Sequence, residues 1–380
     1  MQQQKRFLAL DVFRGMTICF MIIVNTSPDE ANTFPPLLHA HWHGFTPTDL
    51  VFPSFLFAVG NAMSFVMRKW ETMSTPAVLA KIFKRTLLIF ILGYLMYWFP
   101  FVRFDRAANH FIFWPFAKTR VFGVLQRIAL AYCFASLMIY FFKLRTTIII
   151  SALILLVYWA VMFYFGDAAD PLSLNGNAVL KLDLFLLGPD HLYHGEGVPF
   201  DPEGFLSTFP AIVNVVGGYW AGQFLQQREF TYEKLYERLT KLMLAGFVLL
   251  VLAHFWNYAF PINKKLWTSS FVLHTVGLDC LILCAIIFIV DIKHKSSWTP
   301  FFQVFGKNPL FIYLLSEVLV ILWNVFRFPD HTTTIYKWLY VNIFSHGPMY
   351  LGAFIQAILY MLLCWSVGYW MDKRKIYVRV

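Results

Sequence analysis

The sequence has few charged residues for its length. Asp, Glu, Lys and Arg make up 14% of its 380 residues, whereas hydrophobic residues make up 59%. Soluble domains usually carry about 25% charged residues, so this composition excludes an ordinary water-soluble globular protein. The mean hydropathy of +0.59 supports the same conclusion. The chain is therefore expected to lie in a lipid bilayer.

The signatures of several chemical classes are also missing. The sequence has no GK[ST] phosphate loop, no GxGxxG after a strand and no GxSxG, so phosphoryl transfer, hydride transfer and serine hydrolysis have no support. There is no CxxC pair either, and every cysteine lies in an apolar segment, which argues against outer-face disulfides and a thiolate metal site. These are Cys19, Cys133, Cys280, Cys284 and Cys364.

Long apolar runs are what the sequence does contain. A helix needs about 20 mainly apolar residues to cross a membrane, and about ten such stretches are present. They do not alternate apolar and polar residues, which favours helices over a β-barrel. We expect an all-α fold, a polytopic membrane bundle of about ten transmembrane helices forming one domain, residues 1–380. The expected spans are 8–25, 49–67, 83–101, 121–142, 146–165, 205–226, 241–260, 266–290, 301–326 and 350–372.

The distribution of Lys and Arg predicts the orientation. Most of them lie in connections that share one side of the membrane with the N-terminus. Positive residues stay on the cytoplasmic side during insertion, so both termini are expected to be cytoplasmic. The outer side then receives HAHWHG, residues 39–44, and the connection 166–204, which is long enough to cover an active site. Residues 102–120 also face outward with four positive charges, which suggests that these charges hold an anion.

The net charge of +10 does not indicate nucleic-acid binding. The basic residues are spread over short segments between apolar runs and form no long patch. Contact with anionic lipid headgroups explains them. We expect the lipid bilayer, and no nucleic acid, as a partner.

The first apolar segment, LDVFRGMTICFMIIVN, contains a carboxylate, a guanidinium and an asparagine amide. Asp11 and Arg14 are three residues apart and therefore share a helix face. Burying both charges is costly, so such residues usually serve a site, although this pair could also simply lock neighbouring helices together. Asn25, at the outer end, either directs its amide toward a carbonyl oxygen or caps the helix.

The block HAHWHG places His39, His41 and His43 at alternate positions, so an extended chain projects them to one side. A zinc site needs further ligands that are not evident nearby, and no metal is expected. One neutral histidine acting as a general base fits better, because an unperturbed imidazole has a pKa of about 6.5. An ordinary outer-loop role also stays open. Asp49 either orients an imidazole or caps the next helix.

Arg120, Gln126 and Arg127 lie in TRVFGVLQRIALAY, residues 119–132. Arg127 is inside an apolar run, where an arginine needs a carboxylate, carbonyls or a bound anion as its partner. It either pairs with Asp11 or binds phosphate or carbonyl groups of a substrate. The sequence does not separate these alternatives.

Five further charged residues stand at membrane boundaries. Asp201 and Glu203, in DPEGF, either orient a hydroxylated substrate or cap the helix that follows. Lys307, in GKNPL, is a cytoplasmic residue suited to a phosphorylated ligand. Lys264 and Lys265, in PINKKLW, stand at the outer start of a helix.

These blocks resemble the family of heparan-α-glucosaminide N-acetyltransferases, which are transmembrane acyltransferases. The resemblance implies transfer of an acetyl group from cytoplasmic acetyl-CoA to an amino sugar or related glycan on the other side. It also implies that His39 is the catalytic histidine and that Asn25 is the asparagine of the first helix. The matching segments are LDVFRGMTICFMIIVN, HAHWHGFTPTDLVFPSFLFAVGNAMS, RVFGVLQRIALAY, DPEGFLSTFPAIVNVVGGYWAG and INKKLWTSSFVL.

The chemistry of such a transfer assigns roles to the candidate residues. His39 acts as the general base, Asn25 as the donor to the oxyanion, and Asp49 as a group that orients the imidazole. His41 and His43 contact the acceptor or take no part. Direct transfer is favoured over an acetyl-histidine intermediate, which spacing does not exclude. The residues expected along the donor passage are Arg14, Arg120, Gln126, Arg127 and Lys307.

The main competing interpretation is an amino-sugar transporter or permease in which the intramembrane charges line the route. The sequence shows no internal repeat, which favours the enzyme. We expect the membrane to be a bacterial inner membrane, and the sequence is compatible with a homodimer.

Overall fold

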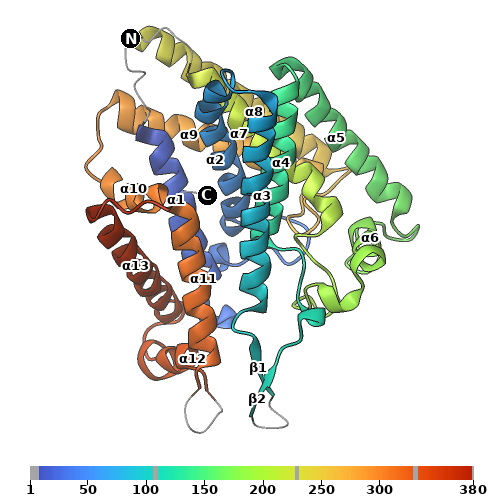
Figure 1. Cartoon of the computed structure of the whole chain (residues 1–380), viewed down its shortest axis with the longest axis vertical. Helices are drawn as coiled ribbons and strands as arrows, with labels where there is room; N and C mark the ends of the chain where they lie inside the picture. The colour runs from blue at the N-terminus through green and yellow to red at the C-terminus, as the bar shows by residue number, and fades with distance from the viewer. Residues whose placement is uncertain (1–7, 106–109, 227–230, 328–332, 379–380) are drawn as a thin grey trace.

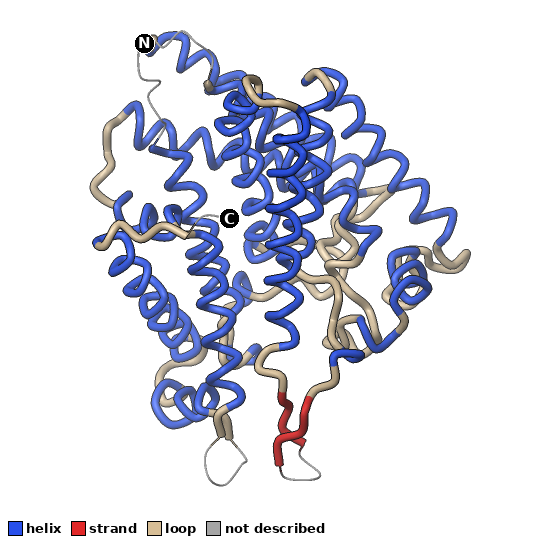
Figure 2. The backbone as a smooth tube through the Cα atoms, viewed as in Figure 1, coloured by secondary structure: helices blue, strands red, loops and turns tan. Residues whose placement is uncertain are grey.

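The computed structural model describes residues 8–105, 110–226, 231–327 and 333–378. This part of the chain is mostly helical (Figure 2). The helices are α1 (Leu8–Asn25), α2 (Pro47–Trp70), α3 (Thr75–Trp98), α4 (Val124–Phe141), α5 (Leu144–Phe165), α6 (Ala178–Leu187), α7 (Phe205–Leu225), α8 (Tyr232–Asn257), α9 (Ser269–Ile287), α10 (Thr299–Lys307), α11 (Pro309–Val325), α12 (Ile335–Leu339) and α13 (Leu351–Lys373). Strands β1 (Val102–Asp105) and β2 (His110–Phe113) form an antiparallel hairpin.

The expected all-α membrane architecture is confirmed. Each predicted apolar segment overlaps a helix, and in the described residues seven helices are long and apolar enough to cross a membrane. These seven are α1, α2, α4, α5, α8, α9 and α13. The remaining predicted segments coincide with α3, with α7 and with the α10–α11 pair, which counts as an eighth span if the pair is taken as one.

The structure departs from the prediction in three places. Segment 301–326 is two helices that meet at an angle of 84°, because Pro309 lacks an N–H donor and disfavours helical geometry at Asn308. The long connection after α5 contains the short helix α6. Within the predicted outer connection 102–120, residues 102–105 and 110–113 pair as β1 and β2, with Val102 opposite Phe113.

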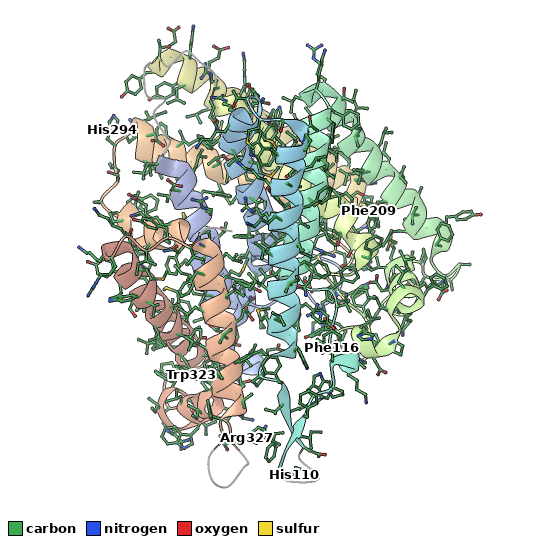
Figure 3. All side chains as sticks on the ribbon, viewed as in Figure 1. His110, Phe116, Phe209, His294, Trp323 and Arg327 are labelled. Carbon is green, nitrogen blue, oxygen red and sulfur yellow. The ribbon has the colours of Figure 1, made fainter. Side chains whose placement is uncertain are left out.

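The helices form two groups around a central set. Helices α1, α2, α3, α4 and α7 run through the middle, with α10 to α13 on one side and α5 and α6 on the other (Figure 1). The connection between α1 and α2 carries His39, and this end of the bundle is called the His39 end. The hairpin belongs to it, and Figure 3 shows His110 and Arg327 at this end and His294 at the opposite one. Arg14 lies in the first half of α1, toward that opposite, Arg14 end.

Glycine allows α2 and α7 to touch backbone to backbone. A Cβ atom added at Gly60 would lie 1.8 Å from the carbonyl oxygen of Val215, and one at Gly218 would lie 1.9 Å from that of Phe57. Helices pack this closely in lipid only where small residues face each other. The contact fixes the position of α2, whose first turn carries Asp49.

Gly218→Ala is expected to destabilise the protein, because the added methyl group has no space beside Phe57. Overpacking of this kind usually costs about 1–3 kcal/mol. The measurement is the thermal unfolding midpoint of the purified variant in detergent. Gly347→Ala is the control, since its Cβ would meet Phe344 O at an ordinary 3.7 Å. Equal midpoints for the two variants would contradict the packing argument.

Candidate active site

His39 and Asp49 form a hydrogen-bonded pair at the His39 end. His39 Nδ1 lies 2.7 Å from Asp49 Oδ1. The other carboxylate oxygen accepts hydrogen bonds from the backbone N–H groups of Ala40 and Thr46, at 3.1 and 3.0 Å, and from the Thr46 hydroxyl. The side chain of Asp49 is 1% exposed and that of His39 is 41% exposed. Asp49 therefore both orients the imidazole and caps α2, the two roles that the sequence left open.

This pairing defines the chemistry of the imidazole. With a buried carboxylate at Nδ1, the neutral ring carries its proton on Nδ1 and its lone pair on Nε2. Burial lowers the pKa of His39, Lys264 lowers it further, and Asp49 acts in the opposite direction. The result is an accessible, neutral imidazole that is able to accept a proton at Nε2.

The other two histidines of the block do not join this pair. His41 is exposed. His43 Nδ1 lies 3.4 Å from the side-chain nitrogen of Asn263, and burial lowers the pKa of His43. Among the residues that the structure describes, no three His, Cys, Asp or Glu side chains converge as metal ligands would.

A cluster of opposite charges lies beside the pair. Arg120 donates to both oxygens of Asp201, at 2.8 and 2.6 Å, and to Glu203 Oε2 at 2.7 Å. Asp201 is fully buried, so it holds Arg120 in place. Burial raises the pKa of Asp201; burial alone would also raise that of Glu203, but the surrounding cations keep it low. The positive charge of Arg120 is thus matched by carboxylates of the same protein.

Arg127 is fully buried next to this cluster. Its Nη2 donates to the Ser207 hydroxyl and to the Gly204 carbonyl, and its guanidinium lies 4.6 Å from the centre of the Trp267 ring. Its Nε and Nη1 have no protein hydrogen-bond partner. The suggested pairing of Arg127 with Asp11 is wrong: Arg127 makes the contacts just given, and Asp11 instead pairs with Arg14 at 2.8 Å. The ion pair that the spacing of Asp11 and Arg14 predicted is present.

Two acidic residues of this region escaped the sequence analysis. Asp183 on α6 accepts a hydrogen bond from the first backbone N–H of α7, and burial raises its pKa to about 7. Glu317 on α11 contacts the Asn25 side chain through a hydrogen bond. Both are charged residues inside apolar runs, the pattern by which Arg127 was identified as a candidate site residue. Asn25 is the last residue of α1 and is exposed, and its contact with an oxyanion stays a prediction.

The connection 166–204 lies against the histidine block. The Trp42 indole donates to the Leu172 carbonyl at 2.8 Å, and the ring packs on Phe200 with centroids 5.6 Å apart. Glu196 forms an ion pair with Lys265 at 2.6 Å. These contacts attach the connection to the segments that carry His39 and Lys264.

A second region of interest is a cavity of about 690 Å³ at the Arg14 end. Drug-sized ligands usually occupy cavities of about 300–1,000 Å³. Its cations come from four different segments, namely Arg14, Lys69, Arg85 and Lys307. Between them the walls are mainly apolar and aromatic, with Trp70 and Tyr132 among the rings. The combination suits a ligand with an anionic head and a less polar extension.

The cavity extends along α2 toward the His39 end. Its lining on α2 runs from Trp70 to Phe55, which is about 22 Å at 1.5 Å per residue. Phe55 is six residues beyond Asp49, or about 9 Å along the helix axis. The basic cavity and the His39 pair thus both lie along α2, separated by about 9 Å in the direction of the helix axis.

The residues that were predicted to line the donor passage lie in two different regions of the structure. It brings Arg14 and Lys307 to the basic cavity, where Lys307 also pairs with Asp372 at 2.7 Å. Arg120 and Arg127 lie at the His39 end instead. Gln126 is fully buried beside Gly93. For these three, contact with a donor stays a prediction, while Lys69 and Arg85 are lining residues that the sequence analysis missed.

Comparison with known proteins places the chain in a family. Residues 6–246 match a family described as heparan-alpha-glucosaminide N-acetyltransferase, catalytic, over more than half of the chain. The chain belongs to this family. The heparan-alpha-glucosaminide N-acetyltransferases of Mus musculus and Homo sapiens are each 26% identical to it in an alignment of 427 positions that covers 99% of this chain and 60% of each relative. The chain thus spans 60% of the length of these relatives.

The family match contains the principal elements of both regions. His39, Asp49, Arg14 and Arg85 all lie between residues 6 and 246. Lys264, by contrast, lies beyond that range. The heparan-alpha-glucosaminide N-acetyltransferase resemblance inferred from the sequence blocks is confirmed at the level of the family.

Proposed function

We propose that the protein is an integral membrane N-acetyltransferase. It moves an acetyl group from acetyl-CoA, bound at the cytoplasmic Arg14 end, to an amino sugar or related glycan at the outer His39 end. The observation that carries this proposal is the arrangement along α2: a basic cavity at one end and an oriented, neutral imidazole at the other. Family membership supports acetyl transfer as the reaction.

The basic cavity fits the chemistry of acetyl-CoA as a substrate. Arg14, Lys69, Arg85 and Lys307 supply positive charge for its phosphates. The apolar walls on α2, α3 and α4 suit its thin pantetheine arm. The acetyl thioester is then directed along α2 toward His39.

The His39 pair performs the proton transfers of a direct reaction. As the acceptor nitrogen bonds to the thioester carbonyl carbon, His39 Nε2 takes the proton that the amine loses. The π electrons of the carbonyl move to its oxygen, which Asn25 is proposed to stabilise. When the carbonyl reforms, the C–S bond breaks, and the proton passes from His39 to the leaving sulfur. The products are an amide and the free thiol of CoA.

Asp49 keeps the imidazole in the orientation and tautomer that this step needs. The connection 166–204, attached through Trp42 and Lys265, covers the acceptor side. His41 is exposed beside the pair and is suited to contact the sugar. We place the protein in a bacterial inner membrane, with both termini in the cytoplasm.

The direct test is incubation of the purified protein with radiolabelled acetyl-CoA and a panel of amino sugars. Acetylated product is expected with the parent protein. Sugar uptake into liposomes without acetylated product would contradict the enzyme and support a transporter. Sidedness is tested separately: a cysteine at position 41 should react with an impermeant thiol reagent from outside, and reaction from inside would reverse the orientation.

Arg85→Met is expected to weaken acetyl-CoA binding. The Arg85 guanidinium lines the cavity over the Tyr132 ring, and its Nε lacks a protein partner. Hydrogen bonds to charged groups contribute about 1.5–3 kcal/mol, so KM for acetyl-CoA should rise about tenfold or more, with kcat little changed. Lys84→Met is the control, because Lys84 is exposed and is not part of the lining. Equal KM values for the two variants would remove Arg85 from the donor site.

A further inference from the structure

Lys264 stands against the imidazole of His39. Its Nζ lies 3.1 Å from His39 Nε2 and 3.4 Å from Nδ1. Lys264 belongs to the connection between α8 and α9, far from His39 in the sequence. From the sequence alone, Lys264 is only a cation at the outer start of a helix.

The two distances locate the ammonium relative to the ring. The lone pairs of Nδ1 and Nε2 point to different sides of an imidazole. A donor in line with the Nε2 lone pair would therefore stand much farther from Nδ1 than from Nε2. Nearly equal distances place Nζ about midway between the two nitrogens and away from the line of the Nε2 lone pair. The direction of the Nε2 lone pair is thus left for an acceptor amine.

The connection that carries Lys264 is built to hold its shape. Asn263 accepts from the Leu266 N–H at 2.9 Å, and its own N–H donates to the Thr268 hydroxyl at 3.1 Å. The backbone N–H of Trp267 donates to the Lys264 carbonyl at 3.0 Å. Trp267 is fully buried and has a φ of 53°, in the left-handed region. Non-glycine residues adopt such backbone geometry mainly where the surrounding structure imposes it, often at functional sites.

Lys264 forms no direct ion pair in the part of the chain that the structure describes. Within the described residues, no Asp or Glu oxygen lies within the 4.0 Å ion-pair distance of its ammonium. The charged groups that face it are Asp49 on α2, Glu203 before α7, Arg127 on α4 and the neighbouring Lys265. Burial lowers the pKa of Lys264, and the two carboxylates oppose that effect. A partly buried cation held beside the base is suited to a negative charge that arises during the reaction.

We propose that Lys264 is a further catalytic residue, whose ammonium stabilises the negative charge on the acetyl oxygen while His39 Nε2 takes the proton of the amine. This inference rests on the proposed acetyl transfer. The ammonium is close enough to Nε2 to reach a carbonyl that is attacked there, and electrostatic stabilisation of such an oxyanion is commonly a large contribution to catalysis. The same charge disfavours protonation of His39 and of the incoming amine, so both stay in their reactive forms.

Lys264→Met and Lys264→Arg test this role. Loss of one oxyanion donor usually lowers kcat about 10²–10³-fold, and Lys264→Met is expected to do so with little change in KM for acetyl-CoA. Because Lys264 lowers the pKa of His39, the acid limb of the pH profile should move to higher pH in this variant. Lys264→Arg should restore part of the rate and move the basic limb to higher pH, since a guanidinium stays charged.

A second readout does not depend on activity. Diethyl pyrocarbonate modifies neutral imidazole, so the pH midpoint of His39 modification, followed by mass spectrometry, should also rise in Lys264→Met. Lys241→Met is the control, because Lys241 pairs with Glu237 on the exposed side of α8, and neither kcat nor the midpoint should change.

An active Lys264→Met variant with the parent's kcat and midpoint would overturn the proposal while leaving acetyl transfer in place. A parent protein that acetylates no amine would overturn the proposed function and, with it, the oxyanion role. In that case an unchanged modification midpoint in Lys264→Met would, in addition, show that the charge of Lys264 does not act on the pKa of His39.

Discussion

His39→Gln is expected to reduce acetyl transfer about 10²–10⁴-fold, the usual contribution of a general base. Glutamine keeps a polar side chain of similar size but has no nitrogen lone pair that accepts a proton near neutral pH. KM for acetyl-CoA should change little, because the basic cavity lies at the Arg14 end. Initial rates with radiolabelled acetyl-CoA and an active amino sugar measure both quantities.

The pH profile of the parent protein tests the same assignment. A protonated His39 cannot accept the proton of the amine, so the rate is lost as the pH falls through the pKa of His39. Burial and Lys264 hold that pKa below the ordinary value of 6.5. The acid limb of kcat/KM is therefore expected below pH 6.5, and it should be absent from the residual activity of His39→Gln.

His41→Gln is the matched control for this substitution. His41 is an exposed histidine of the same block and lies outside the His39–Asp49 pair. Its loss should leave the acid limb in place, whatever its effect on KM for the sugar. If His39→Gln retained the parent's kcat, or if His41→Gln lost the acid limb, His39 would not be the base.

Asp49→Asn is expected to have the second largest effect, a loss of about 10²-fold or more in kcat. In serine proteases the corresponding Asp→Asn change costs about 10⁴-fold, because the imidazole is held in the wrong tautomer. Here the amide nitrogen of asparagine can donate to His39 Nδ1 and so move the ring proton to Nε2. The base is then present but carries its lone pair on the wrong atom.

The direction of the pH shift separates this effect from unfolding. Asp49 raises the pKa of His39, so the acid limb of Asp49→Asn should move to lower pH, opposite to the shift expected for Lys264→Met. Thermal unfolding in detergent reports the loss at the helix cap, where substitutions cost about 1 kcal/mol. An acid limb that stayed in place, or a loss of rate explained entirely by unfolded protein, would remove Asp49 from the proposed mechanism.

Local sequence patterns were sufficient for part of the site. The three-residue spacing of Asp11 and Arg14 predicted their ion pair, and the position of Asp49 at a helix start predicted a cap and a partner for an imidazole. Both relations join residues close in the sequence, where helix geometry and capping chemistry leave few arrangements. The break at Pro309 likewise follows from local chemistry, although the prediction joined the apolar residues on both sides of GKNP into one segment, 301–326.

Contacts between residues far apart in the sequence could not be predicted from such local patterns. Nothing in the sequence pairs Lys264 with His39, Arg120 with Asp201, or Glu317 with Asn25. Each of these contacts depends on which helices are neighbours and on their rotation about their axes. A single sequence does not contain that information. For this reason the sequence suggested Asp11 as a partner of Arg127, whereas the structure places Ser207 and Trp267 beside it.

The sequence by itself determined that this protein is an all-α membrane protein with costly polar residues at defined depths, because the need to bury apolar runs and satisfy backbone hydrogen bonds allows little else in lipid. Family membership also followed from blocks readable in the chain. Only the tertiary structure decided which cations gather at the Arg14 end and which surround His39. Helix packing through positions such as Gly60 and Gly218 sets these distances, and a charge acts on a pKa or a substrate only over such distances.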